Sequence, residues 1–569
     1  MTTNSHLTEE VDLVVVGSGT GLMSAITAAE FGLRVLVVEK SEYLGGSTAM
    51  SGGGFWIPDN PILRDLGVHG SRECAMVYLD ALVGDTAPRE RRVAHLEHGP
   101  KAIEVLRRNL PNRWLHMVEY ADYFPEVDGG SAYGRALESA PFDLSKLGPD
   151  RPKLRPTPME APVPMPVTGG DYRWMNLMMR KPRGLVRAAV RAAQGAGGML
   201  LKREYASAGQ ALAAGLIIAA RRLGVRMWTE SPLRDLVFED GRVVGVVVER
   251  DGKNQTVRAR RGVVLSAGGF EHNIEMRHEH QSKALEPGWS LANPANQGDV
   301  IRIAESHGAA LTLMDQAWWF PAIPPVQKGG YPSTLLAERS LPGSIIVGPD
   351  GRRFMNEAVN YMTAGQIMLG LDDGEDPHLP AWIVFDQTYR NRYVFGGGIM
   401  PRQDLPEEWY AQGLAHRAAT LDELAQKVGL PELRATVERF NLMADKGHDD
   451  DFHRGDSAYD RYYGDPKVTP NPNLGALRKP PFYAVRVVPG DLGTCGGIMA
   501  DGFARVLRAS GEVIEGLYAT GNCAGNAFGK YYPGPGATIG QGLSFGYIAA
   551  AHAAGRLKEE AREGEPAAA

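Results

Sequence analysis

The residues of this sequence that are most clearly suited to a chemical role lie near its end, in the stretch KYYPGPGATIG at residues 530–540. Two adjacent phenols, Tyr531 and Tyr532, precede two prolines and three glycines. A phenol donates one hydrogen bond and accepts others, and proline fixes the backbone angle φ of a turn. Small residues then begin a predicted helix. The stretch therefore predicts a rigid turn that holds a phenol hydroxyl beside the N-terminus of a helix.

A second group of candidate residues lies near the start, where VVVGSGTGL ends an apolar run. Gly17 and Gly19 permit a tight turn and let the backbone approach a pyrophosphate at a helix N-terminus. The pattern departs from GxGxxG, because position 22 is Leu and the extra glycine is Gly21. Glu39 ends the next apolar run, where an acid accepts hydrogen bonds from ribose hydroxyls. We predict a dinucleotide site, with a glycine-rich packing turn as the alternative.

The elements that must position these residues follow from the hydrophobic periodicity. Residues 11–39 read as one βαβ unit, which predicts a parallel sheet covered by helices. A helix and a β-meander are predicted over about 206–270 and rejoin that sheet. Strand-like and helical patterns similar to those of the first domain recur at about 490–554. We therefore expect an α/β fold with a discontinuous Rossmann-like domain, 1–316 and 485–569, and an α+β catalytic cap domain at 317–484.

Composition excludes several classes of protein. The chain has 569 residues and a formal net charge of −6, without the clustered basic excess that nucleic acid requires. Its three cysteines form no closely spaced pair, so neither a disulfide framework nor a metal site is expected. The first residues lack a secretory signal pattern, and no run is apolar enough to span a membrane. We expect a cytoplasmic protein.

Residues 140–200 form a biased insert in the first domain. A proline-rich stretch precedes RWMNLMMRKPRGLVRAAVRAA, in which basic residues alternate with Trp, Met, Leu and Val. One interpretation is a basic amphipathic segment, residues 173–193, that contacts an anionic membrane surface peripherally. The other is a solvated helix or an interface element.

Five segments in series carry a resemblance to a known superfamily: EKSEYLGGSTAMSGG, GVVLSAGGFEHN, NQGDVIRIAESHGAAL, GLYATGN and GATIGQGLSFGYIAA. Together they resemble the FAD-dependent fumarate reductase and succinate dehydrogenase flavoproteins over almost the whole chain. The resemblance implies an FAD-binding domain. Covalent members carry the flavin on a histidine where this chain has Ser47, so noncovalent FAD is implied. The implied FAD-binding residues are Gly17, Gly19, Gly21, Glu39, Lys40, Gly46, Ser47, Thr48, Gly52, Gly53, Ala267, Gly268, Asp299, Gly521, Asn522, Ala537 and Ile539.

The substrate motifs differ from those of fumarate reductases, which bind a dianion with arginine and histidine. Tyr532 stands where those enzymes have an arginine, and a phenol hydrogen-bonds a neutral carbonyl but cannot neutralise a carboxylate. YYPGPG, DQAWWFP, RRFMNEAVNY, DYFPE and DFHRGDSAYD instead resemble the 3-ketosteroid Δ1-dehydrogenases. That resemblance implies a 3-ketosteroid substrate, dehydrogenated between carbons 1 and 2, and an external electron acceptor such as a quinone.

The implied chemistry needs donors for the enolate oxygen and a base for carbon 2. Tyr532 and the backbone N–H of Gly536 are the predicted donors, and glycine at 536 would let a bulky ring system approach the backbone. By resemblance Tyr361 is the base, assisted by Tyr123. A 4,5-dehydrogenase of 5α-reduced 3-ketosteroids, a fumarate-like reductase and a non-catalytic electron-transfer flavoprotein remain as alternatives.

Two further segments bear on the substrate. Trp318, Trp319 and Phe320 predict either a hydrophobic wall against a flat polycyclic ligand or ordinary core. The family places an aromatic residue on the steroid about 24 positions before the base, where this chain reads LLAERSLPG. This departure predicts a different steroid preference.

Overall fold

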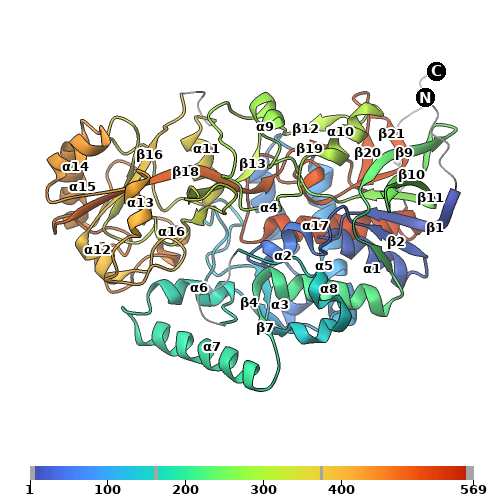
Figure 1. The fold of residues 1–569 in the computed structure, drawn as a ribbon, viewed down its shortest axis with the longest axis horizontal. Helices are drawn as coiled ribbons and strands as arrows, with labels where there is room; N and C mark the ends of the chain where they lie inside the picture. Colours follow the sequence, from blue (N-terminus) through green and yellow to red (C-terminus); the bar gives the residue numbers. More distant parts are fainter. Residues whose placement is uncertain (1–6, 69, 159–164, 372–373, 375, 559–569) are drawn as a thin grey trace.

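The computed structural model describes residues 7–68, 70–158, 165–371, 374 and 376–558. Two β-sheets lie toward opposite ends of the long axis, and helices surround both (Figure 1). The first sheet has eight strands and the second has six. The predicted α/β class is confirmed.

The eight-stranded sheet contains the predicted βαβ unit. Its central strand β1 (Leu7–Val16) pairs in parallel with β2 (Val35–Val38) on one side and β11 (Lys253–Leu265) on the other. All of β2 and the carboxyl ends of β1 and β11 are buried and mostly apolar, as expected of parallel strands covered on both faces. The predicted β-meander is also present, because β11 pairs with β10 and β10 with β9. The other strands of this sheet are β8 (Arg226–Trp228), β9 (Leu233–Glu239), β10 (Arg242–Arg250), β20 (Arg505–Leu507) and β21 (Val513–Ala519).

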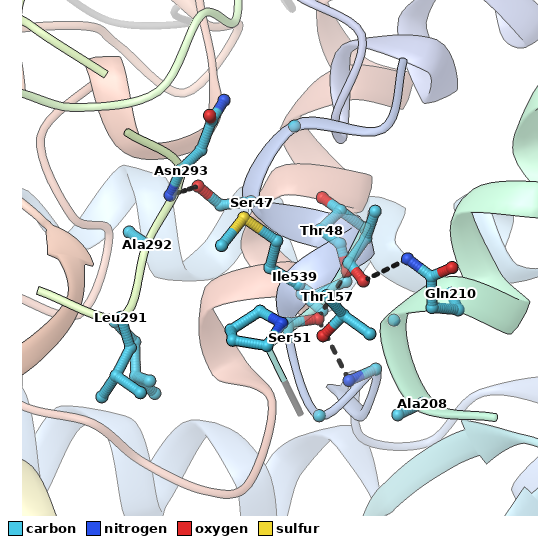
Figure 2. A pocket seen from close by; sticks show the side chains of 18 of the residues that line it. Ser47, Thr48, Ser51, Thr157, Ala208, Gln210, Leu291, Ala292, Asn293 and Ile539 are labelled. Atoms are coloured by element: carbon cyan, nitrogen blue, oxygen red, sulfur yellow. Dashed lines mark hydrogen bonds between the residues drawn. The ribbon is translucent and has the colours of Figure 1, made fainter. Parts of the chain in front are cut away.

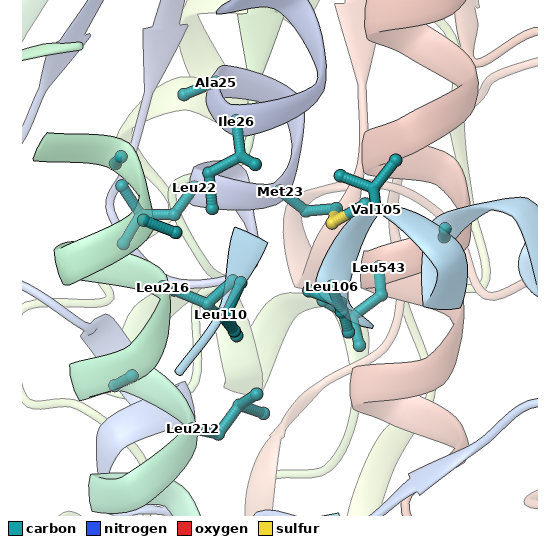
Figure 3. Close-up of a cluster of buried hydrophobic side chains, with 14 of the residues drawn as sticks. Leu22, Met23, Ala25, Ile26, Val105, Leu106, Leu110, Leu212, Leu216 and Leu543 are labelled. Atoms are coloured by element: carbon teal, nitrogen blue, oxygen red, sulfur yellow. The ribbon is translucent and has the colours of Figure 1, made fainter. Parts of the chain in front are cut away.

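Helices from distant parts of the chain pack together beside this sheet (Figure 3). Leu22 and Ile26 of α1 (Gly21–Glu30), Leu106 of α5 (Arg89–Asn109), Leu216 of α8 (Ala208–Arg222) and Leu543 of α17 (Ala537–Ala553) are all fully buried. Removing such side chains from water is the main stabilising contribution of a core. The C-terminal helix thus belongs to the same core as the N-terminal βαβ unit.

The six-stranded sheet belongs to the other lobe. Its longest strand, β18 (Phe482–Thr494), pairs antiparallel with β13 (Ala317–Ile323), β16 (Ala381–Asp386) and β17 (Ala415–Ala418). The predicted domain boundary at 484/485 therefore falls inside β18. The sheet also contains β14 (Ser333–Thr334) and β15 (Ser344–Val347); its surrounding helices are α11 (Tyr361–Met368), α12 (Gln387–Arg392), α13 (Glu407–Ala411), α14 (Leu421–Val428), α15 (Leu433–Lys446) and α16 (Ala458–Tyr462).

The insert forms helices α6 (Gly169–Asn176) and α7 (Pro182–Leu200), which lie along the lower edge of the molecule in Figure 1. Within the described residues no helix is both long and apolar enough to cross a membrane. Part of the proline-rich stretch, 159–164, lies outside the described residues. The remaining elements are α2 (Gly46–Met50), β3 (Phe55–Trp56), α3 (Pro61–Asp65), α4 (Arg72–Val83), β4 (Trp114–His116), β5 (Ala136–Ser139), β6 (Phe142–Asp143), β7 (Tyr205–Ala206), α9 (Ile274–His280), α10 (Asp299–Ser306), β12 (Leu311–Thr312), β19 (Gly497–Ile498) and two 3₁₀ segments, Leu144–Lys153 and Gly521–Cys523.

Candidate active site

A cavity of about 2140 Å³ connects the two lobes. Typical sites for a single small ligand occupy about 300–1,000 Å³, so this cavity has room for a cofactor and a substrate together. Two of the predicted site residues, Gly21 and Ala537, do not line it. All the others do: Gly17, Gly19, Glu39, Lys40, Gly46, Ser47, Thr48, Gly52, Gly53, Tyr123, Ala267, Gly268, Asp299, Tyr361, Gly521, Asn522, Tyr532, Gly536 and Ile539.

The glycines of the first turn have separate structural reasons. Gly17 has a φ of +104°, and a Cβ there would lie 2.2 Å from the carbonyl oxygen of Ser266, so only glycine fits. A Cβ on Gly21 would lie 3.1 Å from Val15 Cγ1 and 3.0 Å from Ser266 Cβ. Gly21 therefore serves the close packing of α1 on the sheet. Gly19 lies beside Thr48, and a Cβ there would lie 3.2 Å from Thr48 Oγ1.

Glu39 is buried at the end of β2 and is held by serines on both sides. One carboxylate oxygen accepts hydrogen bonds from the backbone N–H and the hydroxyl of Ser18, at 3.2 and 2.7 Å. The other accepts from the backbone N–H and hydroxyl of Ser41, at 3.0 and 3.1 Å. A ribose would share these oxygens with Ser18 or Ser41. The next residue, Lys40, forms an ion pair with Asp299 at the cavity wall.

Figure 2 shows the hydroxyl side chains of the second cluster, Ser47, Thr48 and Ser51, in and beside α2. The Ser47 hydroxyl accepts hydrogen bonds from the Asn293 backbone N–H at 3.2 Å and from the Asn296 side chain at 3.1 Å. Ser51 donates to the Thr48 carbonyl at 2.7 Å and so fixes the end of this short helix. Ser47, the second residue of α2, therefore joins this helix to the facing 291–296 loop.

The residues present fit a dinucleotide. In the described part of the chain no side chain caps the N-termini of α1, α2 or α17, which begin beside the cavity-lining residues Thr20, Gly46 and Gly536. Such termini offer unpaired N–H groups and partial positive charge to anionic ligand groups. The buried acid at Glu39 and the volume of the cavity complete the requirements of a bound FAD.

Three predicted catalytic phenols, on three separate segments, meet in one buried cluster. Tyr123 follows β4, Tyr361 is the first residue of α11, and Tyr532 precedes α17. Their ring centroids are 5.1–5.3 Å apart in every pairing. The Tyr123 hydroxyl donates to the Tyr361 oxygen at 2.8 Å, and the Thr538 hydroxyl donates to the Tyr532 oxygen at 2.9 Å.

Burial raises the pKa of all three phenols above the usual 10. For Tyr361 the rise is large, and the hydrogen bond from Tyr123 opposes it by favouring the phenolate. For Tyr532, hydrogen bonds from Thr538, Tyr361 and the backbone at Gly536 oppose the rise in pKa. The cluster therefore concentrates hydrogen-bond donors at the Tyr532 oxygen and one donor at the Tyr361 oxygen.

The YYPGPG turn is fixed by contacts with both lobes. The Pro533 carbonyl accepts hydrogen bonds from the Tyr78 hydroxyl at 2.7 Å and from the Tyr123 backbone at 3.0 Å. A Cβ on Gly534 would lie 2.4 Å from the Trp56 ring. These contacts place Tyr532 inside the cavity, whereas Tyr531 does not line it.

The predicted reason for Gly536 was wrong in part. Its φ of +84° is a left-handed conformation, and a Cβ there would lie 2.2 Å from the Gly54 carbonyl oxygen. Glycine is therefore required by the adjoining 54–56 segment, whose Trp56 N–H donates to the Gly536 carbonyl at 3.2 Å. A Cβ at position 536 would point at the Gly54 backbone, so the need for glycine here does not depend on the approach of a bulky ligand.

The aromatic triplet divides between core and cavity. Trp318, Trp319 and Phe320 are all buried, and only Phe320 lines the cavity, with its ring 4.6 Å from that of Tyr361. Trp318 packs edge-on against Tyr532 at 4.8 Å and donates from Nε1 to Asn522 at 3.1 Å. The two tryptophans are therefore core residues, one of which supports the cluster.

Sequence reasoning missed several residues of the cavity wall. Tyr120, Tyr463, Tyr172, Glu338 and Thr538 all line it. The density of tyrosines in EYADYFPE and AYDRYYG was a signal for Tyr120 and Tyr463. Glu338 was marked only as part of LLAERSLPG and Tyr172 by no local pattern, because their proximity arises from segments far apart in the chain.

Comparisons with known proteins agree with this geometry. A family profile described as "FAD binding domain" matches residues 12–539. The chain is 46% identical to the 3-oxosteroid 1-dehydrogenase of Mycolicibacterium smegmatis, over 95% of this chain and 97% of that protein. It is 45% identical to the protein of the same name from Mycobacterium tuberculosis, over 96% and 98%.

A solved structure resembles the chain over almost its whole length. It is the 3-ketosteroid Δ1-dehydrogenase from Sterolibacterium denitrificans in complex with 1,4-androstadiene-3,17-dione, with a TM-score of 0.90 and 37% identity. The match covers 96% of this chain and 100% of that one. The chain therefore belongs to the family of FAD-binding flavoproteins that includes the 3-oxosteroid 1-dehydrogenases.

Proposed function

We propose that this protein is an FAD-dependent dehydrogenase that converts 3-keto-4-ene steroids into 3-keto-1,4-dienes. The observation that carries the proposal is the contact of Tyr123, Tyr361 and Tyr532 in the cavity that also contains the dinucleotide cradle. The Tyr532 ring packs against the rings of Tyr123, Trp318 and Tyr361, and its oxygen accepts a hydrogen bond from Thr538. That environment suits a neutral ketone and not a dicarboxylate.

Tyr532 and the backbone N–H of Gly536 hold the 3-keto oxygen in this proposal. Negative charge develops on that oxygen when carbon 2 loses its proton, so the two donors stabilise the enolate-like transition state. Both donors are fixed beforehand, since Tyr532 is 3% exposed and Gly536 is the N-cap of α17. The N-terminus of α17 adds partial positive charge at the same place.

Tyr361 takes the proton from carbon 2. Its oxygen must act as a phenolate, and the hydrogen bond that Tyr123 donates at 2.8 Å stabilises that charged form. Bound FAD supplies the acceptor for the hydride that leaves carbon 1, so one proton and one hydride leave the steroid and a double bond forms between carbons 1 and 2. Phe320 lies against Tyr361 and helps to exclude water from its oxygen.

We propose noncovalent attachment of FAD, because a serine at position 47 cannot form the histidine–flavin bond of covalent relatives. Denaturation should therefore release all of the yellow colour into the supernatant, and colour that remains in the pellet would contradict this. An external acceptor must reoxidise the flavin in each cycle, and a quinone is the class we propose to test first.

The exposed apolar side chains of the insert, and not its charges, support the proposal of peripheral membrane contact. Arg187 and Arg191 of α7 both pair with buried Asp171, and Arg183 lies 4.4 Å from the Trp174 ring. The same helix exposes large apolar side chains to solvent, namely Leu185, Val186, Val190, Met199 and Leu200. Exposed apolar patches of this kind mark interaction sites.

Sedimentation with liposomes tests this contact. Substitution V186D with V190D should release the protein into the supernatant and leave flavin reduction unchanged. Equal sedimentation of the double variant and the unchanged protein would contradict membrane contact through α7.

Anaerobic addition of androst-4-ene-3,17-dione to the purified holoenzyme tests the main proposal. Flavin absorbance should bleach, and the steroid product should carry a new double bond at carbon 1. A 4-ene formed from a 5α-reduced substrate, without any 1-ene product, would favour the sister 4,5-dehydrogenase. Absence of bleaching with every 3-ketosteroid tried would refute the proposal.

A further inference from the structure

The cavity wall contains a buried carboxyl group that the proposed mechanism does not use. Glu338 is 2% exposed and lines the cavity, within the LLAERSLPG stretch that departs from the family pattern. No described cation lies within ion-pair distance of it. Its neighbour Arg339 points elsewhere and donates to the backbone carbonyls of Leu335, Glu357 and Val359.

Few hydrogen bonds reach this carboxyl group, and those from Tyr172 are long. The Leu336 backbone N–H donates to Glu338 at 3.1 Å, and the Tyr172 hydroxyl lies 3.4 and 3.5 Å from its two oxygens. A carboxylate has about four acceptor positions, so much of its capacity is unused. Burial is the main reason that the pKa of Glu338 rises to about 7. A buried acid with unused acceptor capacity is costly unless a ligand supplies a donor.

Glu138 is a buried glutamate of the same protein whose two carboxylate oxygens both have hydrogen-bond donors. Burial also raises its pKa to about 7. Its two oxygens, however, accept hydrogen bonds from the Gly169 and Gly170 backbone at 2.6 and 2.9 Å, at the start of α6. Glu138 does not line the cavity. It has a structural partner, and Glu338 lacks an equivalent one within the described residues.

A row of aromatic rings leads from the catalytic phenols to Glu338. Tyr532 is followed by Tyr123, Tyr120, Tyr463 and Tyr172, with successive centroids 5.1, 6.2, 5.6 and 6.4 Å apart. These rings give the route from Tyr532 to Tyr172 an apolar lining, which suits a fused-ring ligand. A steroid held by its 3-keto oxygen at Tyr532 and lying along this row directs its far end toward Tyr172 and Glu338.

We propose that Glu338, with Tyr172 beside it, binds a hydroxyl group at the end of the steroid remote from the 3-ketone. This inference rests on the proposed steroid dehydrogenase function and names the substrates that the site prefers. The carboxylate accepts the hydrogen bond of the hydroxyl group. Because Glu338 is remote from the reacting carbons, it affects substrate binding and not the chemical step.

Three probes that differ only at carbon 17 test this assignment. They are 17β-hydroxyandrost-4-en-3-one, androst-4-ene-3,17-dione and androst-4-en-3-one, which carry a hydroxyl group, a ketone and no oxygen there. Anaerobic stopped-flow of the holoenzyme at pH 8.5 gives, for each probe, a Kd and a limiting rate of flavin reduction. Hydrogen bonds to charged groups predict that the hydroxyl probe binds at least about tenfold more tightly than the probe without oxygen.

Glu338→Leu should abolish that preference and leave the limiting rate unchanged. Glu338→Gln retains an acceptor and gains a donor, so it should weaken the preference for the hydroxyl group and improve binding of the ketone. Glu138→Gln, the matched buried control, should keep the wild-type ratio.

A hydroxyl preference that is absent in the wild-type enzyme, or equal in the wild-type enzyme and Glu338→Leu, would overturn the proposal. If the leucine variant does not fold, an unchanged ratio in Glu338→Gln has the same meaning. Bleaching by all three probes with equal affinities refutes only this inference. Bleaching by none refutes the proposed function and this inference with it.

Discussion

The hydrogen bond between Tyr123 and Tyr361 offers the sharpest test of the proposed base. Both side chains are buried, at 4% and 5% exposure, and their oxygens are 2.8 Å apart. Tyr123→Phe removes one hydroxyl and keeps a ring that packs against Tyr532 and Tyr459. The substitution therefore removes the hydrogen bond with little change in packing.

The size of the effect follows from the charge on the base. Burial raises the pKa of Tyr361 well above 10, so the phenolate depends on hydrogen bonding. A hydrogen bond to a charged group contributes about 1.5–3 kcal/mol. At about 1.4 kcal/mol for each factor of ten, Tyr123→Phe should slow flavin reduction about 10- to 150-fold. Tyr361→Phe removes the proton acceptor itself and should cost about 10²- to 10⁴-fold.

The double variant separates assistance from an independent role. Without the Tyr361 oxygen, Tyr123 has no phenolate to stabilise, so adding Tyr123→Phe to Tyr361→Phe should change the rate little. Anaerobic stopped-flow at saturating steroid measures all four rates, and Tyr531→Phe, outside the cavity, is the control. If the rate losses of the two single variants multiply in the double variant, Tyr123 does not act by assisting Tyr361. A wild-type rate in Tyr361→Phe would refute the base assignment.

Three further predictions follow from the same geometry. Tyr532→Phe should lower the limiting rate of flavin reduction about 10²- to 10³-fold, because it removes one of two enolate donors, and a loss below about threefold would argue against this role. The limiting rate should rise with pH between 6 and 10, because the raised pKa of Tyr361 makes the phenolate fraction grow throughout that range; a flat profile would contradict a phenolate base. His95 is fully buried against Trp56, and burial lowers its pKa from 6.5 to about 3. The unfolded chain therefore binds a proton at this residue below pH 6.5 that the folded chain does not, which costs about 1.4 kcal/mol of stability per pH unit. Denaturant unfolding at pH 4.5 and 7.5 should show that His95→Leu loses less stability on acidification than the unchanged protein, and equal losses would show that His95 does not contribute.

The local sequence determined the elements of the dinucleotide half. The apolar run before Gly17, the helix after it and the strand that ends at Glu39 are patterns of neighbouring residues, and each reports its own backbone conformation. The glycines and the acid predicted a dinucleotide site, whereas FAD and a steroid ketone were implied by the resemblance of several motifs in series to known families.

Only the tertiary structure decided how the rest of the site is assembled. Tyr123 and Tyr361 are 238 positions apart, so no periodicity could predict their 2.8 Å contact. The arginines of α7 read as a free basic face in the sequence, but two of them form ion pairs with buried Asp171. Glu338 lies in a stretch that predicted only a changed steroid preference, and its lack of a strong partner follows from how Arg339 and Tyr172 pack around it. Contacts between distant segments depend on three-dimensional packing, which neighbouring residues along the chain do not encode.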